Sequence, residues 1–183
     1  TYRSTKKLGW KEHKHLQRFH IKTNTLPVAK VLNKFRWNNF YNLFFSKKVS
    51  QKAIEKLTSE HKDKFRLQFT DDFINYKNSF NTHYCIELEG CVFWMKIQAI
   101  MHVGMFYAPS NLALQKAIKK LQRKAFLIGI TEFLFQVDAT STMAKQLQTI
   151  VKPKESWLAG YLDFDPEIDL KDFIFTYTDL DTF

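Results

Sequence analysis

The sequence is poor in cysteine, and its potential metal ligands do not cluster at the spacing of a metal site. Its 183 residues include two cysteines, Cys85 and Cys91, which stand six apart without paired histidines at zinc spacing. Three histidines near the start, His13, His15 and His20, lack the three or four ligands at set spacing that most metal sites need. The composition therefore argues against a zinc module, and we expect no metal site.

Long apolar runs are also absent. A membrane-spanning helix needs about 20 consecutive apolar residues, whereas the most apolar window, residues 91–108, is interrupted by Lys96, Gln98 and His102. The chain begins with Thr1, and no apolar signal segment follows. We therefore expect a domain of a longer chain without a membrane span.

The two cysteines are expected to be free thiols. A tight turn at residues 89–90 would pair Cys91 with Leu88 and Cys85 with Trp94, so that the thiols do not face each other across the hairpin. Unpaired thiols are typical of a reducing compartment. We therefore expect a cytoplasmic protein.

The length fits one domain with a sizeable core. Hydrophobic residues make up 45% and charged residues 25% of the chain, which excludes a disordered polymer. Residues 1–16 are polar and basic, and we interpret them as a leader or linker in front of a single domain at residues 17–183.

Positive charge is concentrated in the first third of the chain. Residues 1–66 hold 17 of the 28 Lys and Arg residues but 4 of the 18 acids. This asymmetry indicates either a solvated basic face or contact with an anionic partner, such as nucleic acid, a membrane surface, a cofactor phosphate or the acidic remainder of the chain. Alternating cations and rings at residues 34–37 suit phosphate contact with base stacking, but no known nucleic-acid-binding motif accompanies them.

The first half of the chain predicts one strand and three helices. The strand is expected at residues 16–28 and the first helix at 35–45, where seven large apolar residues, six of them aromatic, either pack into the core or form a stacking surface. Ser50 would cap the second helix, whose apolar stripe is Ile54, Leu57, His61 and Phe65. The third helix is expected at residues 71–80.

The second half predicts a hairpin followed by a strand, helix, strand unit. The hairpin strands are residues 82–88 and 91–97, and a third strand follows at 100–106. The clearest helix, residues 111–128, ends at Gly129 and leads to a strand at 131–137, which predicts a right-handed crossover between parallel strands. Its apolar stripe is Leu114, Ile118, Leu121, Ala125 and Ile128.

The end of the chain predicts a short helix after residues 140–141 and two last strands at 157–162 and 173–177. The chain therefore reads as an α+β domain with a mixed, twisted sheet of about six or seven strands flanked by helices.

This order of elements resembles that of the GNAT acyltransferase superfamily over residues 17–177. The closing segments SWLAGYL, at residues 156–162, and FIFTYTDLDTF, at residues 173–183, are similar to the C-terminal arm of some bacterial members. The resemblance implies an acyl-CoA-dependent N-acyltransferase, with acetyl-CoA or another acyl-CoA as cofactor and an amine of a small molecule, sugar or peptide as acceptor.

The resemblance also implies a cofactor site at the third strand and the following helix. In this superfamily the strand backbone binds pantetheine and the helix start binds the pyrophosphate, which suits the free amides and dipole of a helix N-terminus. The corresponding residues are Val103, Gly104 and Met105, then Ser110, Asn111 and Leu112. The superfamily's glycine-rich loop is not intact, because Gly104 is the only glycine between His102 and Asn111.

Candidate catalytic side chains are few. His102 is a candidate general base or a buried structural histidine, while Gln136 and Ser141 would line the opposite wall of the cleft, Ser141 alternatively capping a helix. The helix after residues 140–141 has no tyrosine, the frequent general acid of the superfamily. The alternatives to an enzyme are a non-catalytic GNAT-like binding domain and a nucleic-acid-binding domain that uses the basic N-terminal half.

Overall fold

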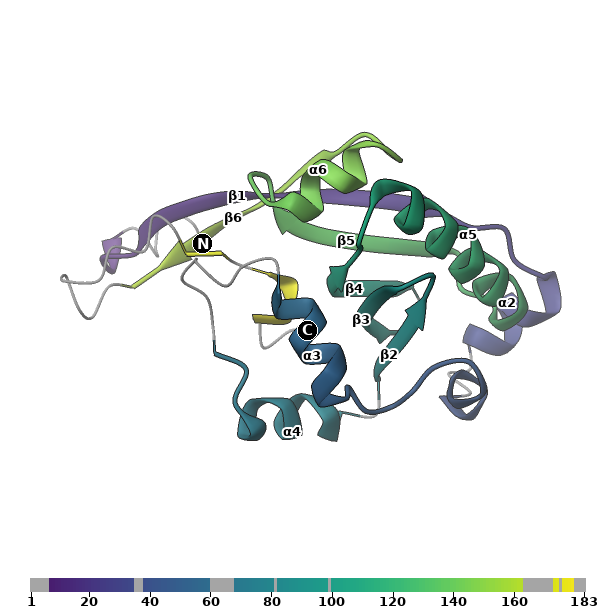
Figure 1. Cartoon of the computed structure of the whole chain (residues 1–183). Coiled ribbons are helices and arrows are strands. Elements are labelled where there is room, and N and C mark those ends of the chain that lie inside the picture. The colour runs from purple at the N-terminus through teal and green to yellow at the C-terminus, as the bar shows by residue number, and fades with distance from the viewer. Residues whose placement is uncertain are drawn as a thin grey trace.

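The fold is a six-stranded mixed sheet with helices on both faces (Figure 1). The computed structural model describes residues 7–34, 38–59, 68–80, 82–98, 100–162, 173–174 and 176–179. The strands lie in the order β2-β3-β4-β5-β1-β6, so the first strand of the chain lies between the last two. The α+β architecture expected from the sequence is confirmed.

The elements follow the chain as one strand, three helical segments, three antiparallel strands, and then alternating helices and strands. Their bounds are β1 Lys11–Lys22, α2 Pro27–Lys34, the 3-10 helix η1 Asn38–Leu43, α3 Gln51–Ser59, α4 Asp71–Ser79, β2 His83–Leu88, β3 Cys91–Ile97, β4 Met101–Tyr107, α5 Asn111–Ile128, β5 Glu132–Asp138, α6 Thr142–Gln148, β6 Lys154–Tyr161 and the 3-10 helix η3 Tyr177–Asp179.

The core surrounds β3, which is covered on both faces. Phe93 stacks on Phe106 on the face that α5 and α6 cover, whereas Trp94 contacts Phe69, which precedes α4, on the other face (Figure 1). Such two-sided burial explains why β3 is a continuous apolar run. The hairpin register pairs Cys85 with Trp94, and both cysteines are buried free thiols, as expected.

The predicted crossover unit is present. β4 and β5 lie side by side and parallel, and α5 connects them. The predicted stripe of α5 is buried in full, and Leu114 and Leu121 are completely covered. Ser110 caps the start of α5 by accepting a hydrogen bond from the Ala113 amide, and Gly129 ends the helix in the left-handed conformation.

The N-terminal elements differ from the sequence prediction. β1 runs from Lys11 to Lys22 rather than over residues 16–28. Its polar first half forms a strand because it pairs with β6, and the hydropathy of the sequence does not indicate this pairing. Pro27 begins helix α2 instead of ending a strand, since proline fits the first position of a helix. The helix predicted at residues 35–45 is a 3-10 helix, η1, over residues 38–43, and residues 35–37 lie outside the described residues.

One further prediction is tested only in part, and another differs from the structure. The predicted stripe of α3 is buried at Ile54 and Leu57, whereas its continuation, His61 and Phe65, lies outside the described residues. The strand predicted at residues 173–177 is replaced, in its described part, by a single antiparallel bridge at Thr176 and the 3-10 helix η3.

Gly129 provides a test of the contact between α2 and α5. A Cβ at Gly129, where φ is +80°, would lie 2.1 Å from the Ala29 carbonyl oxygen, whereas a Cβ at Gly90, where φ is +75°, would meet Pro109 at 3.6 Å. Gly90→Ala should therefore cost only the left-handed backbone penalty of about 1–2 kcal/mol. Gly129→Ala should cost clearly more in chemical denaturation, and equal losses in the two variants would contradict this packing.

Candidate functional site

The parallel strands β4 and β5 pair over three residues and then diverge. The paired residues are Met101 with Phe133, His102 with Leu134 and Val103 with Phe135. β4 nevertheless continues to Tyr107 and β5 to Asp138. The two strands therefore form a V whose open end lies at their carboxyl ends.

A β-bulge lies at the point of divergence. Trp94 on β3 pairs with Met105, and the next residue, Met95, pairs with Val103, so Gly104 is the extra residue on β4. A bulge of this kind bends its strand and increases the local twist, which turns the second half of β4 away from β5. The three residues expected to bind pantetheine, Val103, Gly104 and Met105, thus frame the start of the opening.

The C-terminal segment enters the opening from the β5 side. Thr176 forms an antiparallel bridge with Val137, whose other edge already pairs with Gln17 of β1. The helix η3 that follows contacts both β4 and β5. The described residues of this segment therefore occupy part of the space that the diverging strands leave.

His102 and Gln136 lie on the same face of the sheet. His102 is paired with Leu134, and Gln136 is the next residue of β5 on that face. The ring of Tyr177 lies 6.0 Å from that of His102, between centroids, and 6.2 Å from that of Trp157. The sequence did not single out Tyr177 or Trp157, because only the tertiary structure brings β4, β6 and η3 together.

The surroundings of His102 favour its neutral form. Burial lowers its pKa below the ordinary value and the positive charge of Lys96 lowers it further, while Glu132 opposes the shift. Its Nδ1 is buried without a hydrogen-bond partner among the described residues. A neutral imidazole can accept a proton at neutral pH.

Gln136 and Ser141 differ in the hydrogen bonds that their side chains make. Gln136 is almost fully buried, and its Oε1 lies 3.5 Å from the Ser156 hydroxyl. The Ser141 hydroxyl donates to the Asp138 carbonyl at 2.7 Å and accepts from the Ala144 amide at 3.1 Å. It therefore caps α6, the structural alternative that the sequence had left open.

The start of α5 offers unpaired backbone donors. The Ser110 side chain and carbonyl accept from the amides of Ala113 and Leu114, whereas the amides of Asn111 and Leu112 have no acceptor within the helix. Both residues are exposed, so the three positions expected to bind a pyrophosphate form an accessible helix N-terminus.

α6 is tied to the loop that leads into α5. The Gln146 side chain donates to the Ala108 carbonyl at 3.1 Å, and its Oε1 is buried without a partner among the described residues. This contact fixes α6 beside the open end of the V, on the same face as α5 (Figure 1).

A partly buried ion pair anchors the C-terminal segment to β1 and β5. Lys14 Nζ lies 3.1 Å from Asp138 Oδ2 and donates to the Phe173 carbonyl at 3.3 Å. Burial by itself would raise the pKa of Asp138, but hydrogen bonds from the amide and hydroxyl of Thr140 and from Lys14 together lower it. His13 also contacts the Phe173 carbonyl, at 3.1 Å.

The described residues include neither a group of side chains arranged to hold a metal ion nor a helix long and apolar enough to cross a membrane.

Comparison with known proteins supports the fold. The sequence matches no protein-family model and no curated protein. Among solved structures, the fold is similar to that of a GCN5-related N-acetyltransferase from Kribbella flavida, with a TM-score of 0.50 and 11% sequence identity. The similarity covers 88% of this chain and 39% of that chain, so this chain spans less than half of that protein's length. At this identity the similarity shows a GNAT-like fold alone.

The ion pair of Lys14 and Asp138 can be tested by pH-dependent unfolding. Lys14→Met leaves the Asp138 carboxylate, 2% exposed, without its cation and should lower the free energy of unfolding by about 3 kcal/mol at neutral pH. Because the folded-state pKa of Asp138 is depressed, its contribution is present above the unfolded pKa and is lost as pH falls through the folded pKa. The two proteins should therefore converge in stability at acid pH, and a gap that is constant with pH would contradict the pairing.

Proposed function

We propose that this protein is an acyl-CoA-dependent N-acyltransferase, with acetyl-CoA as the simplest donor. The observation that carries the proposal is the divergence of β4 from β5 directly after Val103, with a bulge at Gly104. Backbone groups of β4 that would pair with β5 in a regular sheet are free of it in this part of the strand. They can hydrogen-bond a ligand that enters between the strands.

The donor's two ends would meet different parts of the site. Val103, Gly104 and Met105 supply backbone groups for the pantetheine arm, and the amides at Ser110, Asn111 and Leu112 supply an anion site for the diphosphate. The helix dipole favours negative charge at that position. The exposed Lys116 lies one turn further along α5 and adds a positive charge.

The reaction requires one proton acceptor. The donor supplies a thioester, whose carbonyl carbon is attacked by the amine nitrogen of a small molecule, sugar or peptide. A C–N bond forms and the C–S bond breaks, and the sulfur leaves as a thiolate, which becomes a thiol when His102 passes on the proton that it has taken from the amine. His102, neutral at physiological pH, accepts the proton that the amine loses, and Gln136 and Ser141 line the β5 side of the site. Tyr177 lies beside His102, within the same constellation.

The work of such a site is chiefly positioning and polarisation of the carbonyl by backbone amides. Few catalytic side chains are therefore needed. We place the activity in the cytoplasm, in agreement with the two free thiols.

Acetyl-CoA binding tests the anion site. If the dissociation constant is about 10 μM, ligand at about 1 mM should stabilise the fold by about 2.7 kcal/mol, a shift of roughly 5–10 °C in melting temperature for a chain of this size. Asn111→Asp places a carboxylate at the first position of α5, where it favours the helix but repels a diphosphate. It should abolish the shift without lowering the parent melting temperature.

A matched variant controls for charge. Asn75→Asp places the same carboxylate on an exposed position of α4 and should leave the acetyl-CoA shift intact. Loss of the shift in both variants, or no shift in the parent protein, would remove the basis for the cofactor site.

His102 is tested by thiol release with a panel of amines. The assay has a low background, because burial raises the pKa of Cys85 to about 12 and that of Cys91 to about 11. His102→Gln should lower kcat by about 10²–10⁴-fold while acetyl-CoA binding persists. Because the pKa of His102 is lowered, the acidic limb of the parent profile should lie below about pH 6.5.

Retention of full activity in His102→Gln would show that another group takes the proton. Acetyl-CoA binding without thiol release for any amine in the panel would instead support the non-catalytic GNAT-like domain.

A further inference from the structure

Helix α2 turns its apolar stripe to solvent. It buries Ala29 and Asn33, whose amide donates to the Gly129 carbonyl at 3.1 Å. Val28 and Val31 are 71% and 56% exposed, and Leu32 lies beside them on the same stripe. A surface helix normally does the opposite and buries its apolar stripe against the core. The apolar stripe of α2 therefore has no covering element among the described residues.

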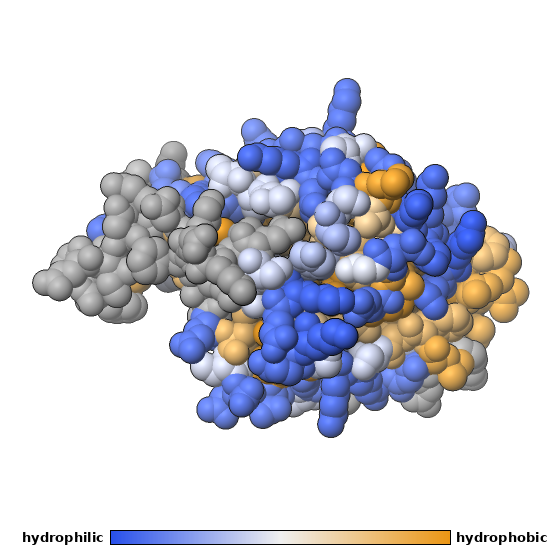
Figure 2. Space-filling model, in the orientation of Figure 1, coloured by the Kyte–Doolittle hydropathy of each residue, from blue (hydrophilic) through white to orange (hydrophobic). Residues whose placement is uncertain are grey.

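The exposed stripe continues onto the end of α5. The amide of Leu26 donates to the carbonyl of Phe126, which places the start of α2 beside the last turn of α5. Leu127 is 53% exposed, and Leu26 and Phe126 are also exposed. Figure 2 shows hydrophobic side chains gathered at this end of the molecule. We call Leu26, Val28, Val31, Leu32, Phe126 and Leu127 the apolar end.

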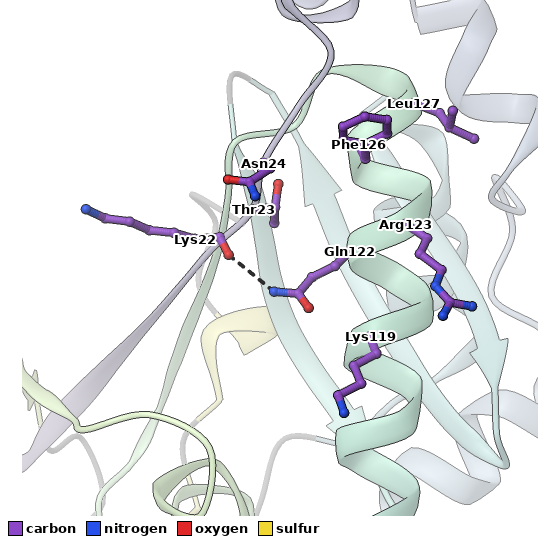
Figure 3. A pocket seen from close by; sticks show the side chains of 8 residues that line it. All are labelled: Lys22, Thr23, Asn24, Lys119, Gln122, Arg123, Phe126 and Leu127. Atoms are coloured by element: carbon purple, nitrogen blue, oxygen red, sulfur yellow. Dashed lines mark hydrogen bonds between the residues drawn. The ribbon is translucent and has the colours of Figure 1, made fainter.

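Cations that have no acidic partner among the described residues surround the apolar end. One hollow, of about 620 Å³, is lined by Lys22, Lys119 and Arg123 together with Phe126 and Leu127 (Figure 3). A second hollow, of about 470 Å³, is lined by Lys30 and Lys34 of α2. Among the described residues, neither hollow has an acidic residue in its lining.

These five cations form no ion pair among the described residues. Lysines elsewhere are paired, as Lys56 is with Glu87 and Lys120 is with Glu89. Glu132, which stands opposite Lys22 in the sheet register, contacts His20 instead, at 2.5 Å. The positive charge around the apolar end is therefore not neutralised within the described part of the fold.

The walls of these hollows are held by hydrogen bonds. Gln122 Nε2 donates to the Lys22 carbonyl at 3.2 Å, as Figure 3 shows. The Thr23 amide donates to the Thr131 carbonyl at 2.9 Å, and because Thr23 lines the first hollow and Thr131 the second, the two hollows adjoin. The surface is thus fixed before any partner arrives.

We propose that the apolar end and its cations form a docking surface for an anionic lipid membrane. Exposed aliphatic side chains can enter the boundary between headgroups and acyl chains, while surrounding Lys and Arg residues attract anionic headgroups. A single-stranded nucleic acid fits less well, because its bases stack on aromatic side chains and the apolar end contains one aromatic residue, Phe126. A duplex binds through its phosphates and would leave the exposed aliphatic side chains unused. The charges complement an anionic surface, whereas they would repel one another in a pair of identical copies.

This surface is separate from the proposed acyltransferase site. It lies at the end of α5, about 25 Å along the helix from Asn111 at a rise of 1.5 Å per residue. Membrane binding can therefore succeed or fail independently of acetyl-CoA binding, and the two experiments test different residues.

The test is sedimentation with lipid vesicles. The protein should bind vesicles of phosphatidylglycerol and phosphatidylcholine at least tenfold more strongly than vesicles of phosphatidylcholine alone, and this preference should weaken at about 0.5 M salt. Lys30→Glu combined with Lys34→Glu should lower binding at least tenfold, and so should Val31→Asp. Leu127→Asp, on α5, provides the same test if the substitutions in α2 prevent folding.

Two matched variants serve as controls. Lys52→Glu removes an exposed cation from α3, and Tyr76→Asp removes a ring that is 50% exposed on α4. Both should bind vesicles within about twofold of the parent protein. The proposal would be overturned by an equal loss of binding in these controls or by absence of binding to anionic vesicles. It would also be overturned by a preference for a single-stranded oligonucleotide, or by a dimer in light scattering that Val31→Asp dissociates.

Discussion

The short parallel pairing between β4 and β5 is the constraint on which the rest of the structure depends. Three residue pairs hold the strands together, and the extra residue at Gly104 then turns β4 away. The connection between parallel strands requires a crossover, which α5 provides by burying Leu114 and Leu121 on the sheet. The same geometry places the start of α5 next to the opening, so one packing arrangement creates both the free strand edge and the exposed helix N-terminus beside it.

The opening is also the place where distant parts of the chain meet. β1 comes between β5 and β6, and its Lys14 pairs with Asp138 at the end of β5. The C-terminal segment then bridges Val137 and brings Tyr177 against His102. In a regular sheet, β4 and β5 would pair along their full length and leave no such space. Here the divergence leaves backbone groups of both strands unpaired with each other, and Thr176 of the C-terminal segment pairs with one of these residues, Val137.

The two ends of α5 have different surroundings. At Asn111 the helix presents free amides and the positive end of its dipole, which suit a compact anion such as a diphosphate. At Leu127 it joins α2 to form an apolar surface flanked by cations that have no acidic partner in the described part of the chain. The cations around this surface therefore come from both parts of the chain: three lie in the basic first third and two lie on α5, namely Lys22, Lys30, Lys34, Lys119 and Arg123.

The sequence by itself determined the elements whose signals are local. The stripe of α5, its end at Gly129 and the hairpin register of Cys85 with Trp94 follow from periodicity and turn chemistry. It also placed His102 and Gln136 on neighbouring strands. Only the tertiary structure decided that β1 begins at Lys11 and lies between β5 and β6, that Tyr177 contacts His102, and that α2 exposes Val28 and Val31. These features depend on partners more than 70 residues away in the sequence, or on a helix face that no other element covers among the described residues. A local pattern of apolar residues does not specify which part of the chain will pack against it.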